Sequence, residues 1–162
     1  MKTLFCVSFL LFIIFHICLC NKALTTKEVP LYIRQSWIKV SEPIRAACIC
    51  ETGVDPNLAF KSIMNTEIAN NQCLMCHYKC LAIKLNLMEA TTGEFVEKEV
   101  LRQSEGVTPE IFAKCNGQVK NEVDLCKKCF DFYLCIIHSV QVPKSNIPYS
   151  KIDEFPMINK MY

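Results

Sequence analysis

The stretch Gln72–Cys80 reads QCLMCHYKC and places three cysteines and a histidine within nine residues. Cys73 to His77 have the C-x-x-C-H spacing that attaches a c-type haem. The same thiols and imidazole are also side chains that zinc accepts as ligands. In a third interpretation, every sulfur belongs to a disulfide. The remaining sequence decides between an electron carrier, an enzyme and a protein in which the cysteines are structural.

The first twenty residues have the composition of a secretory signal peptide. Lys2 supplies a positive start, residues 4–19 are almost entirely apolar, and Cys18 and Cys20 place small side chains before a cleavage site. We therefore expect residues 1–20 to be removed and the protein to be secreted and extracellular, an uncleaved anchor being the alternative. No later stretch reaches the ~18 apolar residues that a membrane span needs.

The mature chain, from about Asn21 to Tyr162, is long enough for one domain with a core. The whole sequence has 18 basic and 16 acidic residues, so loss of Lys2 leaves 17 against 16. This near-neutral balance does not indicate the excess of positive charge that binds nucleic acid or an anionic membrane. Partners should therefore be selected by apolar surface.

Nine cysteines remain after residue 20, and an oxidising compartment favours a disulfide framework for them. Because nine is odd, at least one thiol is left over or pairs with another chain. The nine are Cys48, Cys50, Cys73, Cys76, Cys80, Cys115, Cys126, Cys129 and Cys135.

Helix-capping signals predict a compact all-α domain of about six short helices over residues 21–140. Gly53 suits a left-handed C-cap, and Asp55-Pro56 and Thr108-Pro109 suit helix starts. Pro43 should kink or split the first helix, with Ser41 capping its second half. The expected helices cover residues 30–50, 56–64, 70–88, 94–102, 109–117 and 121–140, followed by an irregular tail, 141–162.

The helical period places the cysteines on particular faces. Cys76 and Cys80 are ~40° apart around their helix and project from one face, whereas Cys126 and Cys135 are ~180° apart. The last helix must then be held from opposite sides. Its stretch FDFYLCII (residues 130–137) is nearly all apolar, which predicts a central position.

The cysteine spacing resembles the six-cysteine signature of insect odorant- and pheromone-binding proteins, over residues 31–140. The motifs are Cys48-x₂-Glu51-Thr52-Gly53-Val54, Cys76-x₃-Cys80, Lys114-Cys115 and Cys126-x₈-Cys135, with intervals of 27, 3, 34, 10 and 8 residues. The resemblance implies the pairs Cys48–Cys80, Cys76–Cys126 and Cys115–Cys135. Six cysteines allow fifteen pairings, so the sequence alone does not select this one, although it satisfies the face argument.

Three cysteines depart from the signature. Cys73 lies one turn before Cys76, and Cys129 one turn after Cys126. If the two helices pack antiparallel, a fourth bridge, Cys73–Cys129, would lie beside Cys76–Cys126. Cys50 then remains as the odd thiol, either buried or used for dimerisation, so we expect a monomer or a homodimer.

The alternatives for the opening stretch fit less well. Haem attachment would use two of the nine cysteines and leave seven without a role. A Cys₄ zinc site from Cys73, Cys76, Cys126 and Cys129 would need reduced thiols in an oxidising compartment. The stretch also resembles part of the active-site helix of secreted phospholipases, but Tyr78 stands where that motif has aspartate, and no glycine-rich calcium loop exists. We therefore expect no catalytic residue, no metal and no cofactor.

The resemblance implies a carrier that holds a small hydrophobic odorant- or pheromone-like ligand in an apolar pocket and delivers it through aqueous lymph to a membrane chemoreceptor. The alternative is a secreted helical protein with a solid core and a structural role. Helical stripes turned away from the bridged faces nominate Tyr78, Ala82, Phe132 and Ile136 as pocket residues. The resemblance adds Met64, Leu87, Met88, Phe95 and Phe112.

The tail after Val142 is interpreted as a lid over the pocket, by resemblance to tails in this family, or as a disordered segment. Titration of His138, Asp153 or Glu154 would then gate release with pH.

Overall fold

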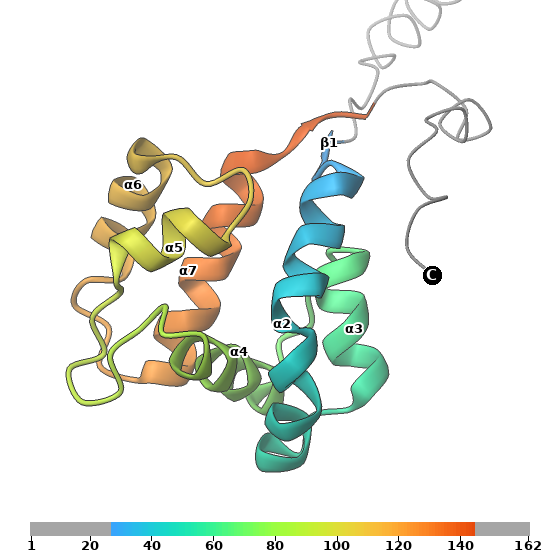
Figure 1. Cartoon of the computed structure of the whole chain (residues 1–162), viewed down its shortest axis with the longest axis vertical. Coiled ribbons are helices and arrows are strands. Elements are labelled where there is room, and N and C mark those ends of the chain that lie inside the picture. Colours follow the sequence, from blue (N-terminus) through green and yellow to red (C-terminus); the bar gives the residue numbers. More distant parts are fainter. Residues whose placement is uncertain (1–26, 145–162) are drawn as a thin grey trace, which may run out of the picture. The chain divides into compact units, whose positions relative to one another are not determined.

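The computed structural model describes residues 27–144, which contain six α-helices joined by short turns (Figure 1). This confirms the all-α class. The predicted signal peptide, residues 1–20, and the tail beyond residue 144, with Asp153 and Glu154, lie outside the described residues. The elements are β1 (Lys27–Glu28), α2 (Leu31–Thr52), α3 (Pro56–Met64), α4 (Gln72–Lys84), α5 (Glu97–Gln103), α6 (Pro109–Val119), α7 (Leu125–Val140) and β2 (Val142–Pro143); β1 and β2 pair.

The predicted caps begin or end three helices. Gly53 adopts the left-handed conformation (φ 66°) after α2, and its N–H donates to the Ile49 carbonyl. The Asp55 carboxylate accepts from the Leu58 N–H at 2.8 Å ahead of α3. The Thr108 hydroxyl accepts from the Ile111 N–H ahead of α6. Each cap satisfies a backbone group that the helix leaves without a partner.

Three predicted helix boundaries are wrong. The last helix, α7, begins at Leu125 after an Asp124 N-cap instead of at residue 121. The other two errors arise because the chain between α4 and α5 turns back on itself. Asn86 has a positive φ of 57°, and the N–H groups of Leu87 and Met88 both donate to the Ala82 carbonyl. The Val96 N–H then donates to the Leu87 carbonyl at 2.8 Å, in extended conformation. As a result α4 ends at Lys84 instead of residue 88, and α5 begins at Glu97 instead of residue 94.

Pro43 does not split the first helix, since α2 runs continuously from Leu31 to Thr52 with the proline inside it. Ser41 is therefore not a cap. Its buried hydroxyl donates to the Ile38 carbonyl at 3.0 Å, three residues back along the same helix. A proline removes one backbone N–H, and tertiary packing outweighs that loss here.

Three disulfides tie the helices in the order α2, α4, α7, α6, and they are the pairs that the resemblance implies. They are Cys48–Cys80, Cys76–Cys126 and Cys115–Cys135. One face of α4 is thus bound to both α2 and α7, and α7 is held from opposite sides by α4 and α6. Each closed loop stabilises the fold by roughly 3–4 kcal/mol through the restricted unfolded chain.

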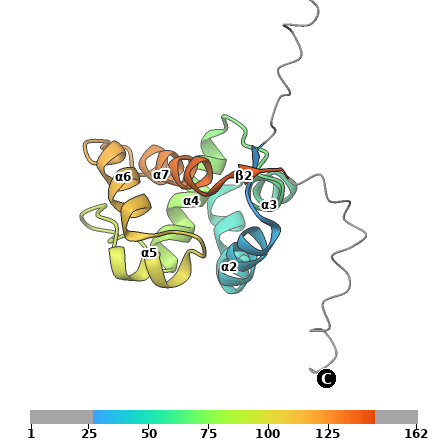
Figure 2. The same cartoon turned by 90° about the horizontal axis from the view of Figure 1, so that it is seen from above.

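Helix α7 is central, as its apolar sequence predicts, with buried residues along its whole length. One core cluster joins α7 to α5, α6 and the start of α2, and a second joins it to α2, α3 and α4. Trp37, Leu87, Phe95 and Tyr133 pack against both clusters. Figure 2 shows α7 with α4 and α6 beside it. Within residues 27–144, no helix has both the length and the apolar character that crossing a membrane requires.

The predicted fourth bridge, Cys73–Cys129, is absent, and both residues have free thiols. Cys73 is exposed, whereas Cys129 is buried with its Sγ 3.4 Å from the Met88 Sδ. The prediction assumed antiparallel packing, but α4 crosses α7 instead of running alongside it (Figures 1 and 2). Moving one turn along each helix from the Cys76–Cys126 bridge therefore takes the two helices apart, and the sulfurs of Cys73 and Cys129 do not meet. Cys50, the remaining free thiol, is exposed.

This arrangement predicts the order in which thiols react with an alkylating reagent. In the native mature protein, iodoacetamide should label Cys50 and Cys73, and label Cys129 only after denaturation without reductant, because burial protects it. Peptide mass mapping measures the sites. A disulfide-linked peptide joining Cys73 to Cys129 would contradict the structure.

Candidate functional site

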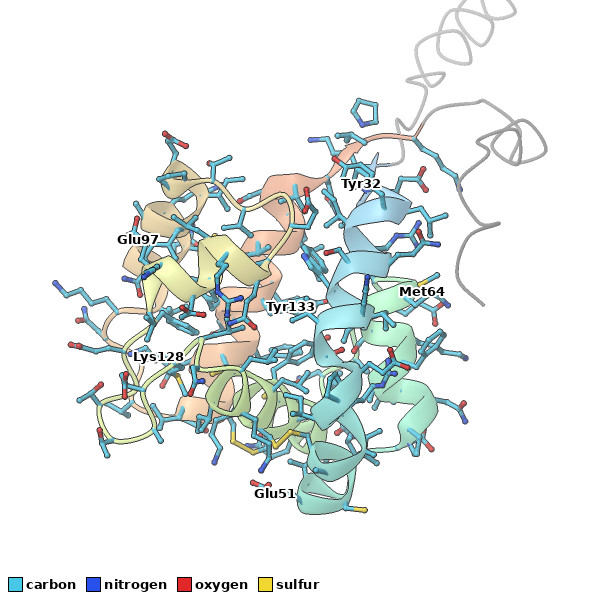
Figure 3. All side chains as sticks on the ribbon, viewed as in Figure 1. Tyr32, Glu51, Met64, Glu97, Lys128 and Tyr133 are labelled. Carbon is cyan, nitrogen blue, oxygen red and sulfur yellow. A yellow bond between two sulfur atoms is a disulfide. The ribbon has the colours of Figure 1, made fainter. Side chains whose placement is uncertain are left out.

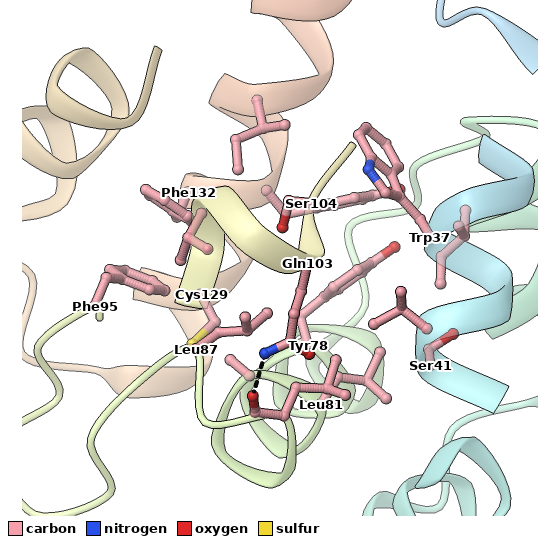
Figure 4. A pocket seen from close by; sticks show the side chains of 17 residues that line it. Trp37, Ser41, Tyr78, Leu81, Leu87, Phe95, Gln103, Ser104, Cys129 and Phe132 are labelled. Atoms are coloured by element: carbon pink, nitrogen blue, oxygen red, sulfur yellow. Dashed lines mark hydrogen bonds between the residues drawn. The ribbon is translucent and has the colours of Figure 1, made fainter. Parts of the chain in front are cut away.

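A cavity with a volume of about 110 Å³ lies between α2, α4, α5 and α7 (Figure 4). Its lining is mostly aliphatic and aromatic, and none of the side chains carries a formal charge at neutral pH. The seventeen lining residues are Trp37, Val40, Ser41, Ile63, Tyr78, Leu81, Ala82, Leu85, Leu87, Phe95, Val100, Gln103, Ser104, Cys129, Phe132, Tyr133 and Ile136.

Two helical stripes supply eight of the seventeen wall residues. On α4 and its C-cap the stripe is Tyr78, Leu81, Ala82 and Leu85, and on α7 it is Cys129, Phe132, Tyr133 and Ile136. Both have the spacing i, i+3, i+4, i+7, which places side chains along one side of a helix. On α4 this side lies opposite the bridged cysteines, so the disulfides and the cavity use different faces of the same helix.

Aromatic rings stack in two pairs across this wall. Tyr78 and Tyr133 have ring centroids 4.1 Å apart, and Phe95 and Phe132 are 3.9 Å apart. The indole of Trp37 meets Tyr133 edge to face at 5.9 Å. Figure 3 shows Tyr133 pointing from α7 toward α2. Such pairs stabilise by about 0.5–1.5 kcal/mol beyond their buried area, and they join α2, α4 and α7 through flat, rigid surfaces.

The two tyrosine hydroxyls are engaged by one buried serine. The Ser62 hydroxyl donates to the Ala59 carbonyl at 2.8 Å, so the Tyr78 hydroxyl donates to Ser62 Oγ at 2.7 Å. The Tyr133 hydroxyl donates to the Ser62 carbonyl at 2.9 Å. Burial raises the pKa of both Tyr78 and Tyr133 above the ordinary value of 10.0. Both phenols are therefore neutral and already paired.

Other polar groups of the wall are also paired within the protein. The Trp37 indole N–H donates to the Glu105 carbonyl at 3.0 Å. The Gln103 amide nitrogen donates to the Leu85 carbonyl at 2.8 Å and to Glu99 Oε2 at 3.0 Å. Burial raises the pKa of the Cys129 thiol to about 12, so it is uncharged at neutral pH. The cavity is electrically neutral and offers few polar contacts.

Six of the nine predicted pocket residues lie in the wall: Tyr78, Ala82, Leu87, Phe95, Phe132 and Ile136. Their role in binding a ligand stays a prediction, but their common position shows that the helical-face argument selects the correct sides of α4 and α7.

The other three predicted pocket residues do not line this cavity, and their placement is corrected here. Phe112 lies behind Phe132, with ring centroids 5.9 Å apart, and Met88 lies behind Cys129. Met64 is at the end of α3, where its carbonyl accepts from the Arg34 guanidinium, and Figure 3 shows it on the outer side of that helix. Ile63, the preceding residue, faces the cavity instead.

Sequence reasoning missed eleven wall residues, of which four had a usable signal. Leu81, Leu85, Cys129 and Tyr133 complete the two stripes that were only partly used. The remaining seven reach the wall through tertiary packing, and the i, i+3, i+4 spacing that six of them show along α2 and α5 does not by itself reveal which neighbour they face. They are Trp37, Val40, Ser41, Ile63, Val100, Gln103 and Ser104.

The cysteines of the opening stretch do not form a haem or zinc site. Cys76, which both alternatives require outside a disulfide, is bonded to Cys126, which the zinc alternative requires as well. Over residues 27–144, no group of three or more His, Cys, Asp or Glu side chains is placed to hold a metal ion.

His77 is fully buried on the bridged side of α4, and neither of its ring nitrogens has a hydrogen-bond partner. Arg45 Nη1 is buried and unpartnered as well. Burial lowers the pKa of His77 below its ordinary value of 6.5, and the positive charge of Arg45 lowers it further, with the Cys48 backbone opposing the shift. His77 is absent from the cavity wall, and its imidazole is held in the neutral form.

Comparisons with known proteins agree with this geometry. The model of the PBP/GOBP family matches residues 35–139. A pheromone-binding protein of the cockroach Leucophaea maderae, in complex with the fluorescent reporter ANS, is 18% identical, with a TM-score of 0.53, over 63% of this chain and 93% of that chain. The likeness to that structure shows the shared fold.

Two further comparisons complete the findings. A medfly odorant-binding protein is 23% identical with a TM-score of 0.44, over 60% of this chain and 85% of that chain. No curated protein sequence matches the chain significantly.

The buried imidazole predicts that the fold loses stability in mild acid. Since the unfolded chain binds a proton at His77 more readily than the folded chain, the free energy of unfolding should fall as pH drops below about 6.5, by at most ~1.4 kcal/mol per pH unit. Denaturant unfolding between pH 7 and pH 5 measures this slope. His77→Leu should flatten it, because leucine has no group that binds a proton in either state.

His138, which is exposed, supplies the control for this measurement. His138→Gln should keep the slope of the unmodified protein. Equal slopes in the unmodified protein and in His77→Leu would contradict the assignment.

Proposed function

The chain belongs to the PBP/GOBP family, and on that premise we propose that it is a secreted carrier of small hydrophobic ligands. The ligand, of the odorant or pheromone type, is held in the cavity between α4 and α7 and carried through aqueous lymph to a membrane chemoreceptor. The observation that supports this most directly is the neutral, aromatic-lined cavity. The family consists of carriers, so we assign no catalytic residue.

The physical basis is transfer of apolar surface out of water. A ligand that loses some 150–200 Å² of apolar surface gains about 4–5 kcal/mol at ~25 cal/mol per Å². Contacts with the aromatic walls add to this, and immobilising the ligand subtracts from it, so we expect a dissociation constant between about millimolar and about micromolar. Such an affinity suits a carrier, which has to release its ligand as well as bind it.

The six predicted wall residues supply complementary parts of the proposed site. Phe95 and Phe132 offer one stacked aromatic surface, Tyr78 another, and Leu87 and Ile136 aliphatic contacts. Ala82 is the smallest of the six, and its short side chain leaves the space that the larger residues surround.

A substitution at Ala82 tests the site. Ala82→Leu should fill the cavity and lower affinity at least tenfold for small apolar molecules such as p-xylene, because the added carbons occupy the ligand's volume. Displacement of an environment-sensitive apolar dye, or the shift of the melting temperature with ligand, measures the affinity. Ala113→Leu, at an exposed position on α6, is the matched control and should leave affinity unchanged.

Two results would contradict the proposed function. The first is the absence of saturable displacement in the unmodified protein, which would indicate a core that accepts no ligand. The second is equal affinity in the unmodified protein and in Ala82→Leu. Phospholipid hydrolysis measured on the same preparation tests the enzyme alternative.

A further inference from the structure

We propose that the cavity favours small, neutral aromatic molecules that donate a hydrogen bond, with simple phenols as the chemical class, and that Gln103 Oε1 is the acceptor. This inference rests on the proposed carrier function and adds to it the class of ligand and the residue that selects it. It follows from the orientation of one amide, the pairing of the other polar groups, and the size and charge of the cavity.

The orientation of the Gln103 amide is determined by its neighbours. Its nitrogen donates to two acceptors that cannot donate in return, the Leu85 carbonyl and Glu99 Oε2. The opposite orientation would place the amide oxygen against both of these oxygens. Figure 4 shows the nitrogen turned toward Leu85 and the oxygen on the other side of the amide group. No hydrogen bond of the described residues engages that oxygen.

The donor groups of the other polar side chains in the wall are already engaged, apart from the Ser104 hydroxyl. The hydroxyls of Tyr78 and Tyr133 both donate to Ser62, the Ser41 hydroxyl donates to the Ile38 carbonyl, and the Trp37 N–H donates to the Glu105 carbonyl. The Ser104 hydroxyl is free among the described residues, but it rotates, whereas the Gln103 oxygen is fixed. A fixed acceptor in an apolar wall favours a ligand that brings the donor.

The size and walls of the cavity favour a single ring. Its volume of about 110 Å³ is close to that of an engineered apolar cavity of ~150 Å³ that binds benzene. Stacked pairs on two sides, Tyr78 with Tyr133 and Phe95 with Phe132, present ring edges and faces to such a ligand. Long-chain ligands exceed this volume.

The charge of the wall excludes ionised ligands. Among residues 27–144, no lysine, arginine or histidine lines the cavity, so a fatty-acid carboxylate would be buried without a counter-charge. No aspartate or glutamate of this part of the chain lines it either, so an ammonium group has the same difficulty. A phenol is neutral near pH 7 and keeps one O–H donor, which suits the Gln103 acceptor.

The experiment compares p-cresol with p-xylene, which differ by a hydroxyl in place of a methyl group. In a wall without a free acceptor, p-cresol should bind ten- to one-hundredfold more weakly, because its hydroxyl leaves water without gaining a partner. With the Gln103 acceptor, we expect it to bind at least as tightly as p-xylene. Isothermal titration of the mature protein at pH 7 measures both dissociation constants.

The following variants test whether Gln103 Oε1 accepts the hydrogen bond from the ligand. Gln103→Leu should weaken p-cresol about tenfold and leave p-xylene within twofold, and the retained p-xylene binding reports an intact cavity. Ser104→Ala removes the free hydroxyl of the wall and tests the competing assignment. Lys98→Leu, at an exposed position on α5 outside the wall, is the matched control and should change neither affinity.

The outcomes separate this inference from the proposed function. If p-xylene binds and p-cresol binds tenfold more weakly to the unmodified protein, the ligand class is overturned and the carrier remains. If Ser104→Ala lowers p-cresol affinity and Gln103→Leu does not, the assignment of Gln103 is overturned. If neither molecule binds saturably, the carrier function itself fails.

Discussion

The two disulfides that hold α4 against α2 and α7 are the constraint on which the other features depend. Cys80 binds it to α2 and Cys76 binds it to α7, both from one face of the helix. Leaving a void of about 110 Å³ costs roughly 2–3 kcal/mol at ~24 cal/mol per Å³. One loop closure contributes roughly 3–4 kcal/mol. The stability that the bridges add therefore offsets what the cavity costs, and the unbridged face of α4 can border empty space.

Bridges alone would not keep the walls apart, because side chains can fill a void that the backbone leaves. The stacked aromatic pairs prevent this. Each ring of the Tyr78–Tyr133 and Phe95–Phe132 pairs is held by its partner, and the tyrosines are also fixed at their hydroxyls by Ser62. A ring that turned into the void would lose its stacking, and a tyrosine ring would also leave its buried hydroxyl unpaired. Disulfides thus set the positions of the helices, and aromatic packing maintains the shape of the space between them.

The parts of the fold that the sequence predicts are those encoded locally. The caps at Gly53, Asp55 and Thr108 lie where the predicted helices end or begin, because a cap depends on a few neighbouring residues. The central position of α7 follows from its apolar circumference. The faces of α4 and α7 that border the cavity follow from helical periodicity, since they lie away from the bridged cysteines.

The parts that the sequence does not predict depend on geometry between distant segments. The crossing of α4 over α7 is one such feature, and it separates Cys73 from Cys129 where antiparallel packing would have joined them. The turn at Asn86 is local instead, since Leu87 and Met88 share the Ala82 carbonyl, but it uses a positive φ at a position where no glycine indicates a turn. Gln103 is held at the wall by its hydrogen bond to the Leu85 carbonyl, which lies 18 residues earlier at the end of α4.

Cys129 shows how a residue that resembles part of a disulfide framework serves a different physical purpose. It belongs to the α7 stripe that lines the cavity, three residues before Phe132. Its thiol lies against the Met88 sulfur, away from solvent. The pKa of about 12 that burial imposes keeps the sulfur protonated, and a protonated thiol is a poor nucleophile for disulfide exchange. In that state it behaves as a small, polarisable apolar group. An oxidising environment therefore does not require every cysteine of this chain to pair, because the cavity wall itself protects the one that lies inside it.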